Sequence, residues 1–152
     1  MTAATREFQD SLTELEKQVW FGFLCSHWDI NREIDALLRS ELGISFGDHL
    51  VLFSLVRRGG GPTRLTELAA DTRITISGVS RMVASLEKRG FVERQPDPAD
   101  ARASLVTVTT TANDELQRLE PQIAAIVRRR FLDHFTEDEL QHFSGYLGRI
   151  TT

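Results

Sequence analysis

The chain has 152 residues, the length of one typical domain, and its 41% hydrophobic and 26% charged residues are typical of a globular protein. No apolar run approaches the roughly 20 residues that a membrane-spanning helix needs, and the first residues lack the basic start of a secretory signal, so we expect a cytoplasmic protein with no membrane partner. The single cysteine excludes an internal disulfide and a zinc site built on several thiolates.

The net charge of −4 is unevenly distributed along the chain. Residues 57–102 carry nine Lys or Arg against six Asp or Glu, whereas residues 1–56 carry four against nine and residues 103–152 carry five against seven. A polyanion binder needs a basic face and not a basic average, because phosphate contacts are local. We therefore expect any contact with a polyanion to be made by the middle of the chain.

The first predicted element is a long helix over residues 8–43, which ends at Gly43. Beside its main apolar stripe runs a second apolar row that contains Trp20 and Trp28. From Val19 to Trp28 the helix is apolar over most of its circumference, which is more surface than one core covers. We expect this helix to be buried against a second copy of the chain.

Residues 45–110 are predicted to form a winged helix-turn-helix lobe. Ser45 is placed to cap its first helix, with Asp48 in the first turn and with Leu50 and Phe53 on the inward face. The Gly-Gly-Gly-Pro run that follows Arg58 ends this helix.

Two shorter helices come next, and Thr66 and Thr75 are placed to cap them. The second has an apolar face at helical spacing, made by Val79, Met82, Val83 and Leu86. Because the connection between the two helices is tight, they form a helix-turn-helix pattern in which the polar face of the second helix is free to make contacts.

After Gly90 the apolar period changes from helical to two. The sequence predicts a hairpin, or wing, with strands over residues 91–94 and 104–109 and a turn rich in proline and aspartate between them. Residues 111–150 are then predicted to form C-terminal dimerisation helices, the first containing Pro121 and the last beginning with a capping box at Thr136.

Nothing in the sequence is typical of an enzyme. The four histidines form no HExxH pair, and neither a glycine-rich phosphate loop nor a nucleophile-elbow spacing occurs. We therefore predict a protein that is not an enzyme and that carries no metal or cofactor.

The stretch from Thr66 to Thr109 resembles the multiple-antibiotic-resistance regulator (MarR) family of bacterial winged-helix transcription factors. The residues that carry the resemblance are Glu67-Leu68-Ala69, Val79-Ser80-Arg81, Leu86-Glu87-Lys88-Arg89-Gly90, Asp97-Pro98-Ala99-Asp100-Ala101-Arg102 and Leu105-Val106. The resemblance implies a single, mainly α domain in which the wing and helix-turn-helix are flanked by long N- and C-terminal dimerisation helices. It also implies a homodimer that represses a pseudo-palindromic operator in double-stranded DNA and is released by a small-molecule effector.

The resemblance further implies which residues contact DNA. The helix that begins at Thr75 would lie in the major groove and present hydroxyls and a guanidinium from Thr75, Ser77, Ser80 and Arg81. Arg102 would enter the minor groove from the wing, with Asp100 orienting it. Ala101 stands where many relatives have a second arginine, which predicts weaker backbone contacts. The alternative for these residues is a solvated helix face and a mobile loop tip.

Three side chains of the first helix are candidate contacts for a small aromatic or phenolic effector: Trp20, His27 and Trp28. Such a site is expected between the dimer helices and the DNA-binding lobe, and the competing interpretation is packing in the core or the dimer. Cys25 is expected to pack among apolar neighbours with an inert thiol. A thiol-switched or effector-independent regulator is the alternative.

A protein-interaction module is the competing class, because winged helices also serve as docking domains. The two classes differ in the placement of four cations in the middle of the chain, Arg64, Arg73, Arg81 and Arg102. One shared surface favours DNA, and a scattered arrangement favours docking.

Overall fold

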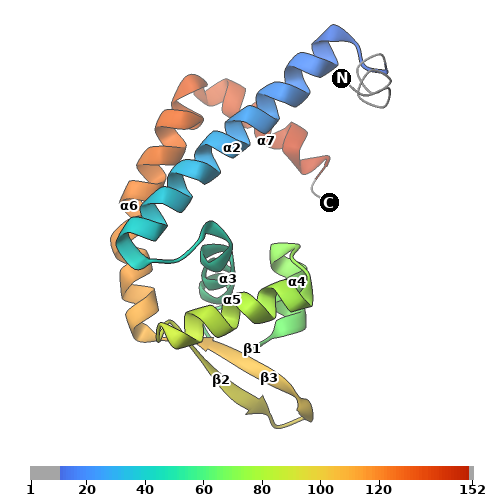
Figure 1. The fold of residues 1–152 in the computed structure, drawn as a ribbon. Coiled ribbons are helices and arrows are strands. Elements are labelled where there is room, and N and C mark those ends of the chain that lie inside the picture. The colour runs from blue at the N-terminus through green and yellow to red at the C-terminus, as the bar shows by residue number, and fades with distance from the viewer. Residues whose placement is uncertain (1–10, 151–152) are drawn as a thin grey trace, which may run out of the picture. The chain divides into compact units, whose positions relative to one another are not determined.

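A computed structural model describes residues 11–150, with the side chains of Ala101 and Arg102 outside the description (Figure 1). Residues 8–10 of the first predicted helix therefore lie outside the described residues. The described elements are α2 (Glu14–Leu42), α3 (Phe46–Arg57), β1 (Thr63–Arg64), α4 (Leu65–Thr72), α5 (Ile76–Lys88), β2 (Val92–Asp97), β3 (Asp100–Val108), α6 (Thr110–Arg130), η1 (Leu132–His134) and α7 (Glu137–Gly148). The mainly α fold with a small β-hairpin is confirmed.

The chain divides into two compact units. We call Ile34–Ile123 the central unit, and Met1–Glu33 together with Ala124–Thr152 the terminal unit. Within residues 11–150, no helix has the combination of length and apolar character that crossing a membrane requires.

The sheet of the central unit is antiparallel with the strand order β1-β3-β2. β2 and β3 form the predicted wing, in which Val92 lies opposite Val108, and Figure 1 shows this hairpin extending away from α3, α4 and α5. The two residues of β1 add a third strand, with Thr63 opposite Val106. The sequence did not predict β1, because a two-residue strand is too short to show a period of two.

The core of the central unit is made by helices and strands together. Its fully buried side chains are Leu38, Ile44, Val51, Leu52, Leu55, Leu68, Val79, Val83, Leu86, Val92, Val106 and Leu119. The prediction that Phe53 lies on the inward face of α3 is wrong, since this side chain is 55% exposed. α3 is apolar nearly all round, so its periodicity did not define the buried face.

Side-chain caps begin several helices. The predicted caps of α3 and α5 are confirmed: Ser45 accepts the N–H of Asp48 at 3.1 Å, and Thr75 accepts that of Gly78 at 3.2 Å. The predicted cap at Thr66 is wrong. α4 begins earlier, directly after β1, so that Arg64 occupies the cap position and Thr66 lies in the first turn.

The terminal unit has a small cluster of half-buried aromatic rings. Phe131, Phe135 and Phe143 form a cluster with ring centroids 5.2–5.9 Å apart. The Glu33 carboxylate binds Arg129 and accepts from the Nε of Arg130 at 2.7 Å, which ties α2 to α6. Many large apolar side chains of this unit remain exposed, including Leu15, Val19, Trp20, Phe21, Phe23, Trp28, Tyr146 and Ile150.

Candidate nucleic-acid interface

α5 has two chemically different faces. Val79 and Val83 are fully buried on one face, whereas Ser77 and Arg81 are exposed on the other. At the exposed start of the helix, the hydroxyls of Thr75 and Ser77 lie 3.2 Å apart. The N-terminal end of this helix therefore presents hydroxyls, a guanidinium and the positive end of the helix dipole to the surroundings.

Two residues of α5 differ from the predicted pattern. Ser80 is half-buried, and its carbonyl accepts a hydrogen bond from the Nη2 of Arg94 at 3.0 Å. Ile76 is an apolar residue that the sequence analysis did not single out, yet it is exposed beside Thr75 and Ser77. Its spacing of three and seven residues from Val79 and Val83 would place it on the apolar stripe, so the sequence held no signal of its exposure.

The wing turn, residues 97–100, is organised by the buried carboxylate of Asp97. This carboxylate accepts the N–H of Ala99 at 2.8 Å and the Nε–H of Arg64 at 2.7 Å. These two hydrogen bonds hold the pKa of Asp97 below its usual range, with the Ala99 amide the larger cause. Asp100 begins β3, while the predicted contact of Arg102 concerns a side chain outside the described part of the chain.

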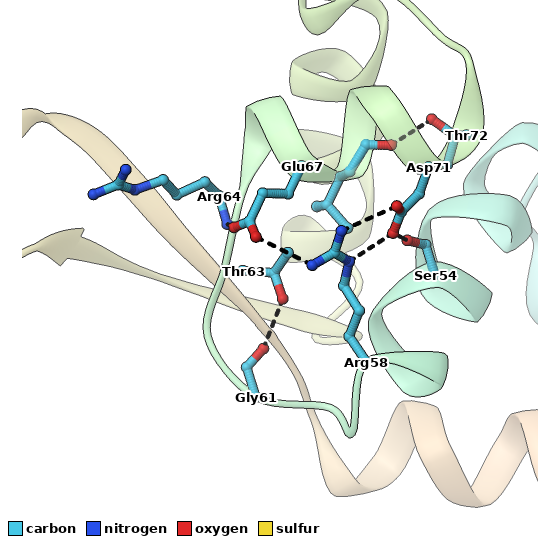
Figure 2. A network of polar contacts seen from close by, with 9 residues as sticks. Ser54, Arg58, Gly61, Thr63, Arg64, Glu67, Asp71 and Thr72 are labelled. Atoms are coloured by element: carbon cyan, nitrogen blue, oxygen red, sulfur yellow. Dashed lines mark hydrogen bonds and ion pairs between the residues drawn. The ribbon is translucent and has the colours of Figure 1, made fainter.

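A polar network fixes the first helix of the helix-turn-helix to α3 (Figure 2). The guanidinium of Arg58 binds both oxygens of Asp71, at 2.6 and 3.0 Å, and reaches Glu67 at 3.1 Å. Ser54 donates to the same aspartate at 2.6 Å. These hydrogen bonds, that from Arg58 first, hold the pKa of Asp71 well below its usual range. The sequence did not predict this network, because Arg58 and Ser54 lie 13 and 17 residues from Asp71.

The four discriminating cations are not equivalent. Arg64 forms an ion pair with Asp97, whereas Arg73 and Arg81 are exposed and form no ion pair with any described residue. Arg73 ends α4 in the left-handed conformation, with φ 56°, within the turn between the two helices of the motif. The turn and the exposed face of α5 thus each carry an arginine that forms no ion pair with a described residue.

The candidate effector residues lie on α2 and are exposed. The rings of Trp20 and Phe23 are stacked with their centroids 6.2 Å apart, and the rings of Phe23 and His27 are stacked with their centroids 6.1 Å apart. Trp28 is 63% exposed. The prediction that Cys25 packs among apolar neighbours is wrong for the single chain, because the Cys25 side chain is exposed on α2. Among the residues described, no group of three His, Cys, Asp or Glu could hold a metal ion.

Comparison with known proteins places this geometry in a family. The MarR family model matches residues 42–103. Sco3205 of Streptomyces coelicolor, a MarR family transcriptional regulator solved in complex with DNA, is 31% identical, with 91% of this chain and 90% of that chain covered and a TM-score of 0.82. AbsC, another MarR family regulator of that organism, is 24% identical with a TM-score of 0.81 over 91% and 93% of the two chains.

A curated relative matches a shorter stretch. The HTH-type transcriptional regulator YxaD of Bacillus subtilis is 40% identical over 90 residues, which are 59% of this chain and 62% of that relative. The first three curated relatives are matched over only 57–62% of their own lengths. The likeness to Sco3205 extends over nearly the whole of both chains, and the residues matched by the family model include the helix-turn-helix and the wing turn, so the chain belongs to the MarR family.

Proposed function

We propose that this chain is the subunit of a homodimeric transcriptional regulator that binds double-stranded DNA. The observation that carries the proposal is the outward face of α5, where Thr75, Ser77 and Arg81 are exposed opposite a buried apolar face. Hydroxyls and a guanidinium suit the acceptors of base edges and phosphates, and an exposed Ile76 offers an apolar contact for a thymine methyl group. Ser80 contributes less, because it is half-buried.

The wing completes the proposed contact. Arg102 enters the minor groove, whose negative potential favours a guanidinium, and Asp100 orients it. Arg73, in the turn of the motif, is unpaired among the described residues and adds a phosphate contact. The DNA-bound relative Sco3205 supports this proposal, since it shares the fold over nine tenths of its length.

The exposed apolar residues of the terminal unit support the homodimer. Val19 is 65% exposed and lies on the same helix as the exposed Trp28. Contact with a second copy removes such surface from water. A two-fold dimer presents two α5 helices about one duplex turn, ~34 Å, apart, which fits a pseudo-palindromic operator. Bound there, the dimer represses transcription by occluding the promoter.

Salt-dependent DNA binding tests the proposal. The DNA upstream of the gene for this chain is labelled with a fluorophore. The affinity of the protein for this DNA is then measured by fluorescence anisotropy at about 50 and about 200 mM salt. Six or more phosphate contacts predict a loss of roughly 1000-fold or more between these conditions. Arg81→Ala is expected to weaken binding about 10-fold or more, whereas the control Arg32→Ala on α2 leaves it unchanged. An affinity that does not change with salt contradicts the proposal and favours a protein-docking module.

We propose in addition that a small aromatic or phenolic molecule releases the DNA. The exposed ring stack of Trp20, Phe23 and His27 supports this, because such rings accept a further aromatic group. Titration with 4-hydroxybenzoate is expected to quench tryptophan fluorescence and to weaken DNA binding by the same coupling factor with which DNA weakens ligand binding. If both Trp20→Leu and Trp28→Leu bind the ligand with the affinity of the wild-type chain, this assignment is contradicted.

A thiol switch is a second candidate for release, because Cys25 is exposed. Peroxide treatment followed by mass spectrometry of the Cys25 peptide is expected to show oxidation together with lost DNA affinity. Cys25→Ser provides the control, since it should keep its affinity after treatment. Loss of affinity in that variant as well contradicts a role for the thiol.

A further inference from the structure

The wing turn is attached to the helix-turn-helix by the charged side chain of Asp97, its first residue. The Asp97 side chain is 5% exposed, and its Oδ2 accepts a hydrogen bond from the Nε of Arg64 at 2.7 Å and lies 2.6 Å from the Nη2 of the same guanidinium. Its Oδ1 accepts the N–H of Ala99 at 2.8 Å. A break in the register of the hairpin between Pro96 and Asp97 separates this carboxylate from the regular ladder.

Arg64 is itself held in place. It pairs with Leu105 in β3, occupies the cap position of α4, and donates its N–H to Glu67 at 3.0 Å. The other oxygen of Glu67 accepts from Arg58, which binds Asp71, and Figure 2 shows the Arg64 side chain pointing away from this network. The partner of Asp97 therefore stands on a backbone that is tied to both α4 and α3.

A second contact joins the wing to α5. The Arg94 guanidinium on β2 donates to the Ser80 carbonyl at 3.0 Å and lies 3.4 Å from the Glu87 carboxylate. β2 is thus fixed to α5 at Arg94 and, three residues later, to α4 at Asp97. An isolated hairpin is only marginally stable in water, so the direction of the wing depends on such ties.

We propose that Arg64 and Asp97 are a positioning pair, which fixes the wing turn relative to α4 and so sets where Asp100 and Arg102 meet the DNA. This inference rests on the proposed DNA-binding function. A preorganised wing does not have to be ordered at the moment of binding, which raises affinity without adding any contact. A displaced turn loses the contact of Arg102, because hydrogen bonding to a groove requires geometry within a few tenths of an ångström.

Arg64 is 47% exposed, so the competing role is a direct contact with a phosphate. Asp97→Asn separates the two roles by the sign of the effect. The substitution removes a negative charge and frees Arg64, so simple attraction to phosphate predicts tighter DNA binding. The positioning pair predicts binding that is about 10-fold weaker. Glu93→Gln is the matched control, since it removes one charge from an exposed position of the same strand and should leave binding unchanged or tighter.

A double-mutant cycle gives the second readout. Arg64→Gln is expected to weaken DNA binding about 10-fold in the wild-type chain and to have little further effect in Arg102→Ala, because the pair acts through Arg102. Effects that multiply overturn the positioning role. A displaced wing leaves the melting temperature of each variant equal to that of the wild type, or speeds amide exchange in the turn alone. An unfolded protein does neither.

Hydrogen exchange tests the tie without DNA. The Ala99 amide should exchange faster in both Arg64→Gln and Asp97→Asn, and an unchanged rate in Arg64→Gln overturns the inference. A wild-type chain that fails to bind DNA overturns the proposed function, and the exchange rates still test the tie. Wild-type binding together with an unchanged Asp97→Asn affinity overturns the positioning pair alone.

Discussion

The two units of the chain treat their apolar residues in opposite ways. In the central unit, leucines and valines from α3, α4, α5 and the wing strands are fully buried. In the described part of the terminal unit, only Ile126 is buried, whereas Leu15 is 69% exposed and Val19 and Trp28 are similarly open. The same residue types thus build a closed core in one unit and an uncovered surface in the other.

The difference shows which part of the fold is self-sufficient. A buried core stabilises the central unit through contacts within one chain, and the Arg58–Asp71 network adds a polar tie between its helices. Large contiguous apolar surfaces are rare on proteins that act as monomers, so the terminal unit is the part that a partner would stabilise. Four sets of substitutions test this account, two of the contrast between the units and two of the ties within the central unit.

The largest effect is expected at the uncovered surface of α2. Val19→Lys places a charge in each half of a two-fold interface and should raise the dimer dissociation constant by about 1000-fold, from ~2 kcal/mol lost per copy. Gln18→Lys, on the polar side of the same helix, is the control and should leave the dimer intact. Sedimentation over a concentration series measures both, and equal behaviour of the two variants contradicts the assignment.

The same leucine-to-alanine change should have different effects in the two units. Leu86→Ala removes a fully buried side chain from α5 and should cost about 3 kcal/mol of unfolding free energy. Leu15→Ala alters an exposed side chain and should change the stability of the central unit by less than about 0.5 kcal/mol. The slowest-exchanging amides of α5 report this free energy. Similar losses of unfolding free energy in the two variants would contradict the difference proposed between the units.

Acid should weaken the tie between α3 and α4. The pKa of Asp71 is lowered in the folded chain, so the stabilisation is fully present above the usual Asp value of 3.8 and is lost as the pH falls through the lowered pKa. Asp71→Asn is therefore expected to be less stable than wild type at pH 7. The difference between their free energies of unfolding should become smaller as the pH is lowered below 4. Denaturant unfolding measures this difference, and a difference that is constant with pH would argue against an ionised Asp71.

The smallest effect separates two threonines that look alike in the sequence. Thr75→Ala removes the cap of α5 and should cost about 1 kcal/mol, whereas Thr66→Ala removes an exposed hydroxyl within α4 and should cost less than about 0.5 kcal/mol. Thermal unfolding of the two variants measures the difference. A larger loss at Thr66 would mean that α4 begins where the sequence predicted.

The sequence predicted the elements that have strong local patterns. The stripe of Val79 and Val83 identified α5, and the change of period after Gly90 identified the wing. Phe53 was misplaced because α3 is apolar on nearly every side, and β1 was missed because two residues show no period. Local pattern thus determines the type of an element, while packing against neighbours decides which of several apolar faces is buried.

The candidate site divides in the same way. The exposed Ser77 and Arg81 followed from their spacing opposite an apolar face, whereas Ser80, predicted on the same face, is half-buried. The partners that hold the site in place did not follow from spacing, since Arg64 and Asp97 are 33 residues apart and meet only after β1 has paired with β3. Sequence spacing predicts which residues share a helix face, but it does not predict which distant carboxylate forms an ion pair with a given arginine.

The composition of the protein–DNA complex tests the central claim most directly. Sedimentation equilibrium of the chain alone, and with a duplex that carries the upstream sequence, gives the number of chains in each species. The account predicts a two-chain species in solution and two chains on each duplex, with both lost in Val19→Lys. A single chain in solution that binds the same duplex with undiminished affinity would contradict it.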